Sequence, residues 1–235
     1  MTNELMLILA MLISFAGVLI FYKGLGKTGL YIWVAVATIS ANIEVALLVD
    51  AFGINQTLGN ILFATTFLTT DILSELYGKE SAKQAVKIGI FTSIAFIIVS
   101  QSWLLYIPSG DTVMQDAMKT VFGNTPRVML AGLVVYAIVQ SLDVVLYHSI
   151  WKWTKNKTQS DKKYLWLRNN GATMLSQLLN AILFNLFAFY GVLPTEVIVE
   201  IIISTYIISF MLSLLDTPVI YLARNMYQKI EQNKK

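Results

Sequence analysis

The sequence contains no cysteine and only one histidine, His148. The absence of cysteine excludes disulfides and thiolate metal sites, although it leaves the redox compartment open. A single histidine also argues against a histidine-based metal site. We therefore expect neither a bound metal nor a cofactor.

Motifs of common catalytic machinery are also missing. The sequence has no glycine-rich phosphate loop, which excludes a nucleotide-driven motor within this chain. It has no His-Glu-x-x-His motif, and no Ser/His/Asp pattern stands out. These absences predict that the chain is not an enzyme, and they favour a function in which a solute is bound and moved.

Charge is scarce as well. Charged residues make up 13% of the 235 residues, and hydrophobic residues make up 56%. A soluble domain needs about a quarter of its residues charged to cover its surface. The net charge of +3 is too small to indicate a nucleic-acid partner. The composition therefore predicts an integral membrane protein whose surroundings are the lipid bilayer.

Long stretches with almost no charge predict an all-α, polytopic bundle of six or seven transmembrane helices. A helix needs about 20 mostly apolar residues to cross the roughly 30 Å hydrocarbon layer. The stretches that meet this requirement are residues 5–22, 29–50, 57–77, 85–107, 127–150, 171–192 and 196–222. The first begins with Glu4 and lacks a small-residue cleavage site, which favours an uncleaved helix over a signal peptide. The longest connections, 108–126 and 151–170, are too short for a further domain, so we expect one transmembrane domain over residues 1–235.

Basic residues cluster after every second span. The clusters consist of Lys23, Lys27, Lys79, Lys83, Lys152, Lys155, Lys157, Lys162, Lys163, Arg168, Arg224, Lys229, Lys234 and Lys235. The alternate connections hold one basic residue, Lys119. By the positive-inside rule, seven spans place the N-terminus outside and the C-terminus in the cytoplasm. Six spans fit equally if the first helix lies along the interface.

Polar side chains recur inside the predicted spans, where burying them is costly and therefore indicates function. The third span carries Asp71 and Glu75, whose i,i+4 spacing places both carboxylates on one helix face. The other polar positions lie on the last three spans: Tyr136, Gln140, Asp143, Tyr147, Ser176, Gln177, Asn180, Asn185, Ser204, Thr205, Ser209, Ser213 and Asp216.

The topology places the three aspartates in the inner half of the bundle and the amides of Gln140, Gln177 and Asn180 nearer its middle. Amides offer donors and acceptors together, and ionised carboxylates only accept. Such a group is suited to reading the edge of a planar, hydrogen-bonding solute, or to carrying a proton.

Several of these residues also have a structural explanation. Asp71 and Glu75 can cap a helix or pair with Lys79 and Lys83, and amides in membrane helices often bond one helix to another. Arg127 is either an outer anchor or an attractant for anionic groups. The sequence Asp216-Thr217-Pro218 is typical of a helix start, so we expect the last span to be kinked or broken there. A kink that only shapes packing is the alternative.

Four segments resemble the queuosine precursor transporter family, which is also called the vitamin uptake transporter or YhhQ family. The first runs from Phe67 to Gly78, with Ala82 following. The second runs from Arg127 to the Gln140-Ser141-Leu142-Asp143 segment. The others are Arg168 to Thr173 with Ser176-Gln177, and Leu215 to Pro218 with Tyr221. The resemblance covers about residues 40–225, in order and at the right spacing.

The resemblance implies import of queuosine precursors, namely 7-deazaguanine bases or queuine, through the bacterial cytoplasmic membrane. The substrate-binding residues that it carries over are Asp71, Glu75, Arg127, Gln140, Asp143, Gln177 and Asp216; the stripe on the fifth span adds Tyr136, and the sixth span adds Asn180. Asn180 and Ser209 stand where family members often have Asp and Lys, which bears on the choice of substrate. Proton coupling and assembly of several copies both remain open. The alternative function is a substrate-binding subunit of an uptake complex that a separate ATPase energises.

Overall fold

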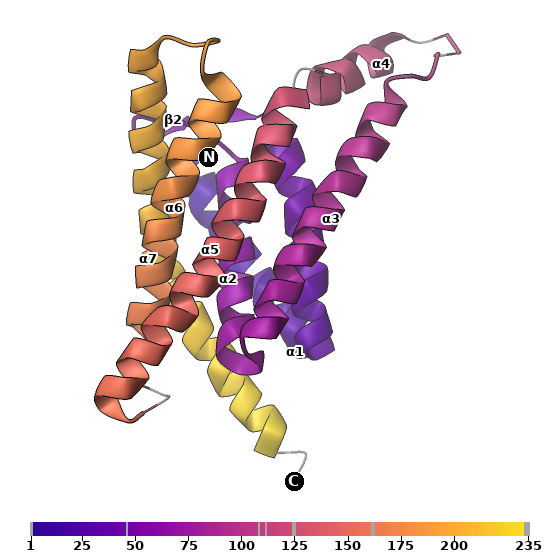
Figure 1. Cartoon of the computed structure of the whole chain (residues 1–235). Helices are drawn as coiled ribbons and strands as arrows, with labels where there is room; N and C mark the ends of the chain where they lie inside the picture. The colour runs from indigo at the N-terminus through magenta and orange to yellow at the C-terminus, as the bar shows by residue number, and fades with distance from the viewer. Residues whose placement is uncertain are drawn as a thin grey trace.

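The computed structural model describes residues 2–45, 47–107, 109–110, 112–123, 126–160 and 163–232. Lys162, Lys234 and Lys235, and the side chain of Lys229, lie outside the described residues. Long helices run side by side between the two ends of a bundle, and α7 finishes at the end away from the start of α1 (Figure 1).

Helix α1 (Asn3–Glu44) is a hairpin of two helical arms. At Gly26 the backbone leaves the helical region, with φ 59° and ψ −137°. The ring centres of Phe21 and Trp33 are 5.4 Å apart. In an unbroken helix, residues twelve positions apart would be separated by about 18 Å. The chain therefore reverses at Gly26, and the predicted spans 5–22 and 29–50 are the two arms.

The second arm ends earlier than predicted. The helix stops at Glu44, and strands β1 (Leu48–Ala51) and β2 (Ile54–Thr57) form an antiparallel hairpin. Phe52 and Gly53 at its tip both have positive φ, at 55° and 72°. This combination belongs to the two-residue turn whose twist matches paired strands. The hairpin replaces the last turn of the predicted span.

The remaining helices confirm an all-α, polytopic membrane bundle. They are α2 (Gly59–Tyr77), α3 (Lys79–Trp103), α4 (Thr112–Met118), α5 (Pro126–Thr158), α6 (Leu165–Phe189) and α7 (Thr195–Gln232), with a π-helical turn η1 (Lys119–Gly123). Among the described residues, α1, α3, α5, α6 and α7 are long and apolar enough to cross a membrane. Helix α2, which is shorter than these five, packs between α1, α3, α5 and α7.

Both predicted long connections contain helix. Helix α5 continues to Thr158 and α6 begins at Leu165, so the connection predicted at 151–170 shrinks to 159–164. Arg168, which we expected in that connection, is a helix residue with 0% exposure. The predicted connection 108–126 contains α4 and η1.

The sequence predicts a kink or a break at Asp216. The break is wrong, because α7 is one helix through Pro218, whereas the kink stays a prediction. Proline is tolerated within membrane helices where neighbouring helices and Ser/Thr side chains satisfy nearby backbone groups. Here the Thr217 hydroxyl donates to the carbonyl of Ser213 at 3.3 Å, and it accepts bonds from α6. These bonds hold α7 against α6 at the proline.

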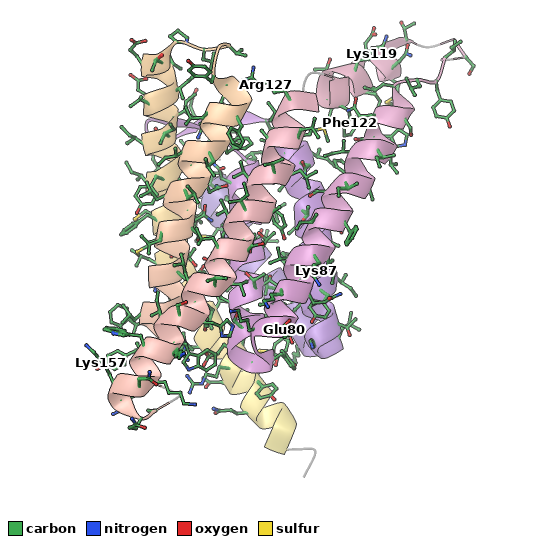
Figure 2. The ribbon with its side chains drawn as sticks, in the orientation of Figure 1. Glu80, Lys87, Lys119, Phe122, Arg127 and Lys157 are labelled. Carbon is green, nitrogen blue, oxygen red and sulfur yellow. The ribbon has the colours of Figure 1, made fainter. Side chains whose placement is uncertain are left out.

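Most of the described basic residues gather at one end of the bundle, which we call the basic end. Figure 2 places Lys157, Glu80 and Lys87 toward this end, and Lys119 and Arg127 at the opposite end. The turn of α1 also lies here, because the Lys27 ammonium is 5.6 Å from the ring centre of Tyr77 at the end of α2. This segregation is what the positive-inside rule requires of a protein that crosses the membrane.

Candidate functional site

A cavity of about 520 Å³ occupies the half of the bundle away from the basic end. Its walls come from the second arm of α1, the first turns of α2, the first half of α5, the second half of α6, and α3, η1 and α7. Phe63 and Phe184 contribute aromatic rings, and Asn42, Asn180 and Asn185 contribute amides. In the described part of the chain, no charged side chain lines it. A neutral, partly aromatic cavity of this size suits a small polar ring.

A pair of carboxyl groups lies deeper in the bundle. Asp71 of α2 and Asp143 of α5 are both fully buried, and their carboxyl groups lie close enough for each to act on the other. Thr173 donates to Asp71 Oδ2 at 3.2 Å, and Ser176 donates to Asp143 Oδ1 at 2.6 Å. The other oxygen of each carboxyl group meets no hydrogen-bond donor among the described residues. Two hydroxyls on successive turns of α6 thus hold the pair.

Asp216 of α7 completes a group of three acids, as the sequence predicts. Its Oδ1 accepts a bond from Asn169 Nδ2 at 2.9 Å, and its charge acts on both Asp71 and Asp143. None of the ion pairs between described residues involves any of the three. Carboxylates without a basic partner at membrane depth are costly, which makes the group a candidate functional site.

The predicted amides connect the cavity to the acids. Gln140 donates to Thr66 at 2.7 Å and accepts from Thr70 at 3.2 Å, which ties α5 to α2. Asn180 lines the cavity and bonds to Gln177 at 3.2 Å. Tyr136 also lines the cavity, and it precedes Gln140 by about one turn on α5. The stripe on α5 therefore leads from the cavity wall to the carboxyl pair.

Glu75 has a different role from the aspartates. It forms a buried ion pair with Arg168, with Arg168 Nη2 at 2.6 Å from Oε2 and Nε at 3.0 Å. The Tyr147 hydroxyl donates to the same oxygen at 2.9 Å, and Arg224 lies 3.5 Å from Oε1. The predicted partners Lys79 and Lys83 do not make this pair; Lys83 binds Glu80 instead, at 2.8 Å. Glu75 thereby joins α2, α5, α6 and α7 on the basic-end side of the acids.

Arg127 stands apart from the other predicted site residues. Its guanidinium donates to the carbonyls of Phe187 and Tyr190, at 2.9 and 2.6 Å. These carbonyls lie at the C-terminal end of α6, where backbone acceptors lack partners within the helix. The structure thus favours the outer-anchor interpretation of Arg127.

Sequence reasoning missed the hydroxyls that position the acids and amides. Thr65, Thr66, Thr69 and Thr70 are all fully buried on α2, and Thr173 holds Asp71. The sequence did contain a signal for these hydroxyls. The pair Thr65-Thr66 is followed four residues later by the pair Thr69-Thr70, and this spacing places both pairs on one side of the helix.

Comparison with known proteins agrees with this architecture. Residues 57–223 match the model of the family described as "Putative vitamin uptake transporter". The chain is 40% identical over 233 residues to a Bacillus subtilis (strain 168) protein named "Probable queuosine precursor transporter", and the match covers 99% of this chain and 100% of that protein. No solved structure matches the chain. The chain therefore belongs to the vitamin uptake transporter family and is a multi-pass membrane transporter.

Proposed function

We propose that this chain imports queuosine precursors, either 7-deazaguanine bases or queuine, across the bacterial cytoplasmic membrane. The observation that carries the proposal is the neutral, amide-bearing cavity next to three buried acids. A deazaguanine base is planar, with donors and acceptors along its edges, so aromatic faces and amides suit it. The name of the Bacillus subtilis relative supports the same substrate class.

In this proposal the substrate first binds in the cavity, against Tyr136 and Asn180. Gln140 and Gln177 lie next on the path, followed by the acids Asp71, Asp143 and Asp216. Phosphorylated forms are not the cargo in this proposal, because no Arg or Lys among the described residues lines the cavity to neutralise a phosphate. Glu75 and Arg127 act at the two ends of the bundle and do not contact the bound base.

Import is proton-coupled in this proposal, through Asp71 and Asp143. Two neighbouring buried carboxyl groups are stable together when a proton is shared between them, since like charges at short distance repel strongly. The pair has no basic partner among the described ion pairs, so a proton is the simplest neutralising charge. Loss of that proton would change the contact between α2 and α5.

The direction of transport follows from the ends of the bundle. If the basic end faces the cytoplasm, the N-terminus lies outside and the cavity lies on the external side. The Glu75–Arg168 ion pair then closes the cytoplasmic side. This conformation is the one that receives substrate from outside.

The test uses cells that cannot make the precursor and lack a carrier of their own. Such cells express the chain and are fed queuine or one 7-deazaguanine precursor at low concentration, and the queuosine content of their tRNA is measured. We expect restoration with at least one compound. With the protein shown to be in the membrane, no restoration by any compound would refute the proposal. Uptake by the purified chain in liposomes, driven by a pH gradient, would rule out the ATPase-dependent alternative.

A further inference from the structure

Polar side chains on two walls of the cavity each donate one hydrogen within the protein. On α1, the Thr38 hydroxyl donates to the carbonyl of Val34 at 2.7 Å, and Asn42 Nδ2 donates to the carbonyl of Thr38 at 2.8 Å. On α6, Asn185 Nδ2 donates to the carbonyl of Ala181 at 2.8 Å. Each bond reaches back one turn along its own helix. The hydrogens engaged in these bonds are not available to a ligand.

These bonds also identify the nitrogen of each amide. A backbone carbonyl cannot donate, so the amide nitrogen of Asn42 and of Asn185 must be the atom that approaches it. Each amide keeps its oxygen as an acceptor and one further N–H, and the Thr38 hydroxyl, whose hydrogen is engaged, can only accept. Thr120, on η1, shows the same arrangement, because its hydroxyl donates to the carbonyl of Asp116 at 2.8 Å. The cavity therefore has acceptors on its α1, η1 and α6 walls.

A cavity of this kind discriminates by hydrogen-bond polarity. A ligand without donors would leave buried acceptors unpaired, which costs more than the bonds themselves contribute. For this reason, a site that hydrogen-bonds a polar group of its ligand strongly rejects an analogue that lacks that group. An apolar pocket rejects a ligand of different size less strongly. A 7-deazaguanine ring carries donors on both of its rings: the ring N–H and 2-amino group of the pyrimidinone, and the pyrrole N–H. Donors on two sides of the ligand match acceptors on facing walls.

We propose that Thr38, Asn42 and Asn185 are specificity-determining residues that select the donor edges of a guanine-type base, the 2-amino group included. This inference rests on the proposed function and refines it, because it names the part of the base that is recognised. It separates two roles within the protein. The neutral cavity reads the base, and the buried acids handle charge.

The test is competition for uptake of a labelled queuosine precursor in cells. The competitors are 7-deazaguanine and 7-deazahypoxanthine, which differ only in the 2-amino group. We expect the unmodified chain to prefer 7-deazaguanine by about tenfold, as one lost hydrogen bond to a buried acceptor implies. Among Thr38→Val, Asn42→Leu and Asn185→Leu, at least one variant reduces this preference to near unity. The control is Thr158→Val, which removes an equivalent one-turn-back bond of 2.8 Å on α5 away from the cavity and leaves the preference unchanged.

The preference ratio distinguishes recognition from structural damage. A variant that is only misfolded lowers uptake and leaves the ratio as it was, and Thr38→Val keeps the shape of the side chain if the asparagine variants are lost from the membrane. Equal inhibition of the unmodified chain by the two competitors would overturn the inference. So would an unchanged ratio in all three variants. Failure of the unmodified chain to take up any deazaguanine would instead refute the proposed function.

Discussion

Replacement of Glu75 tests whether the basic end is held closed by one carboxylate. Both Arg168 and Arg224 approach this group, at 2.6 and 3.5 Å, and the side chains of Glu75 and Arg168 are 5% and 0% exposed. In Glu75→Gln the two guanidinium groups stay close together without the negative charge that they share. Breaking a buried ion pair by removing one partner costs about 3–5 kcal/mol.

The structure predicts an asymmetry between the two sides of the pair. Arg168→Met leaves Glu75 with Arg224 and with the Tyr147 hydroxyl at 2.9 Å. We therefore expect a smaller loss, about 2–3 kcal/mol. For a chain of this length each kcal/mol shifts the melting temperature by about 2–4 °C. Glu75→Gln should then melt roughly 6–20 °C below the unmodified protein.

The assay is thermal unfolding of the detergent-solubilised protein followed by intrinsic fluorescence. Glu80→Gln is the matched control, because it removes a carboxylate from an exposed pair with Lys83, and exposed pairs contribute little to stability. The double variant Glu75→Leu with Arg168→Met should recover much of the loss, since it leaves neither member of the pair without the other. Equal melting temperatures for Glu75→Gln and Glu80→Gln would refute the reasoning. A larger fall in melting temperature for Arg168→Met than for Glu75→Gln would refute it as well.

Three further predictions concern transport. Asp143→Asn should lower precursor uptake at least tenfold at an unchanged protein level in the membrane, because it removes a carboxyl group that the proposed proton transfer needs. Unchanged flux in a tracer assay would exclude this role. Gly89→Ala should lower uptake and melting temperature, because a Cβ there would clash with the buried Tyr136 hydroxyl on the cavity wall. Gly24→Ala, with no atom within 4 Å of the added Cβ, should behave as unmodified protein. The chain has no cysteine, so a single introduced cysteine can be labelled by itself. A membrane-impermeant maleimide added outside cells should label Thr205→Cys in the cavity and should not label Ser74→Cys among the acids. The reverse labelling pattern would contradict the proposed orientation.

The helices and the acid cluster could be predicted because both follow from the cost of placing groups in lipid. A span must be long and apolar to cross the hydrocarbon layer, so it can be recognised in the sequence as a long apolar stretch. An acid within such a span stands out for the same reason. Asp71, Asp143 and Asp216 were therefore identifiable one by one, and their positions along each span indicated that they would meet.

The buried ion pair of Arg168 could not be predicted in this way. It follows a run of lysines, and by local sequence it reads as one more cytoplasmic charge. Its partner Glu75 is 93 residues away, so only the packing of α6 against α2 reveals the ion pair. The unbroken helix at Pro218 has the same origin, because bonds from α6 to Thr217 override a local preference for a helix start. Such features depend on contacts between helices, which a single sequence does not display.

Helix α2 carries all three levels of the proposed transport path. Phe63 lines the cavity, Asp71 belongs to the carboxyl pair, and Glu75 closes the basic end. The twelve steps along the chain from Phe63 to Glu75 span only about 18 Å of helix. Because α2 is enclosed by α1, α3, α5 and α7, a movement of this one helix would alter the cavity, the proposed proton site and the ion pair together. Substrate that fills the cavity and a proton that reaches Asp71 therefore act on the same rigid element, which is the physical requirement for coupling one to the other.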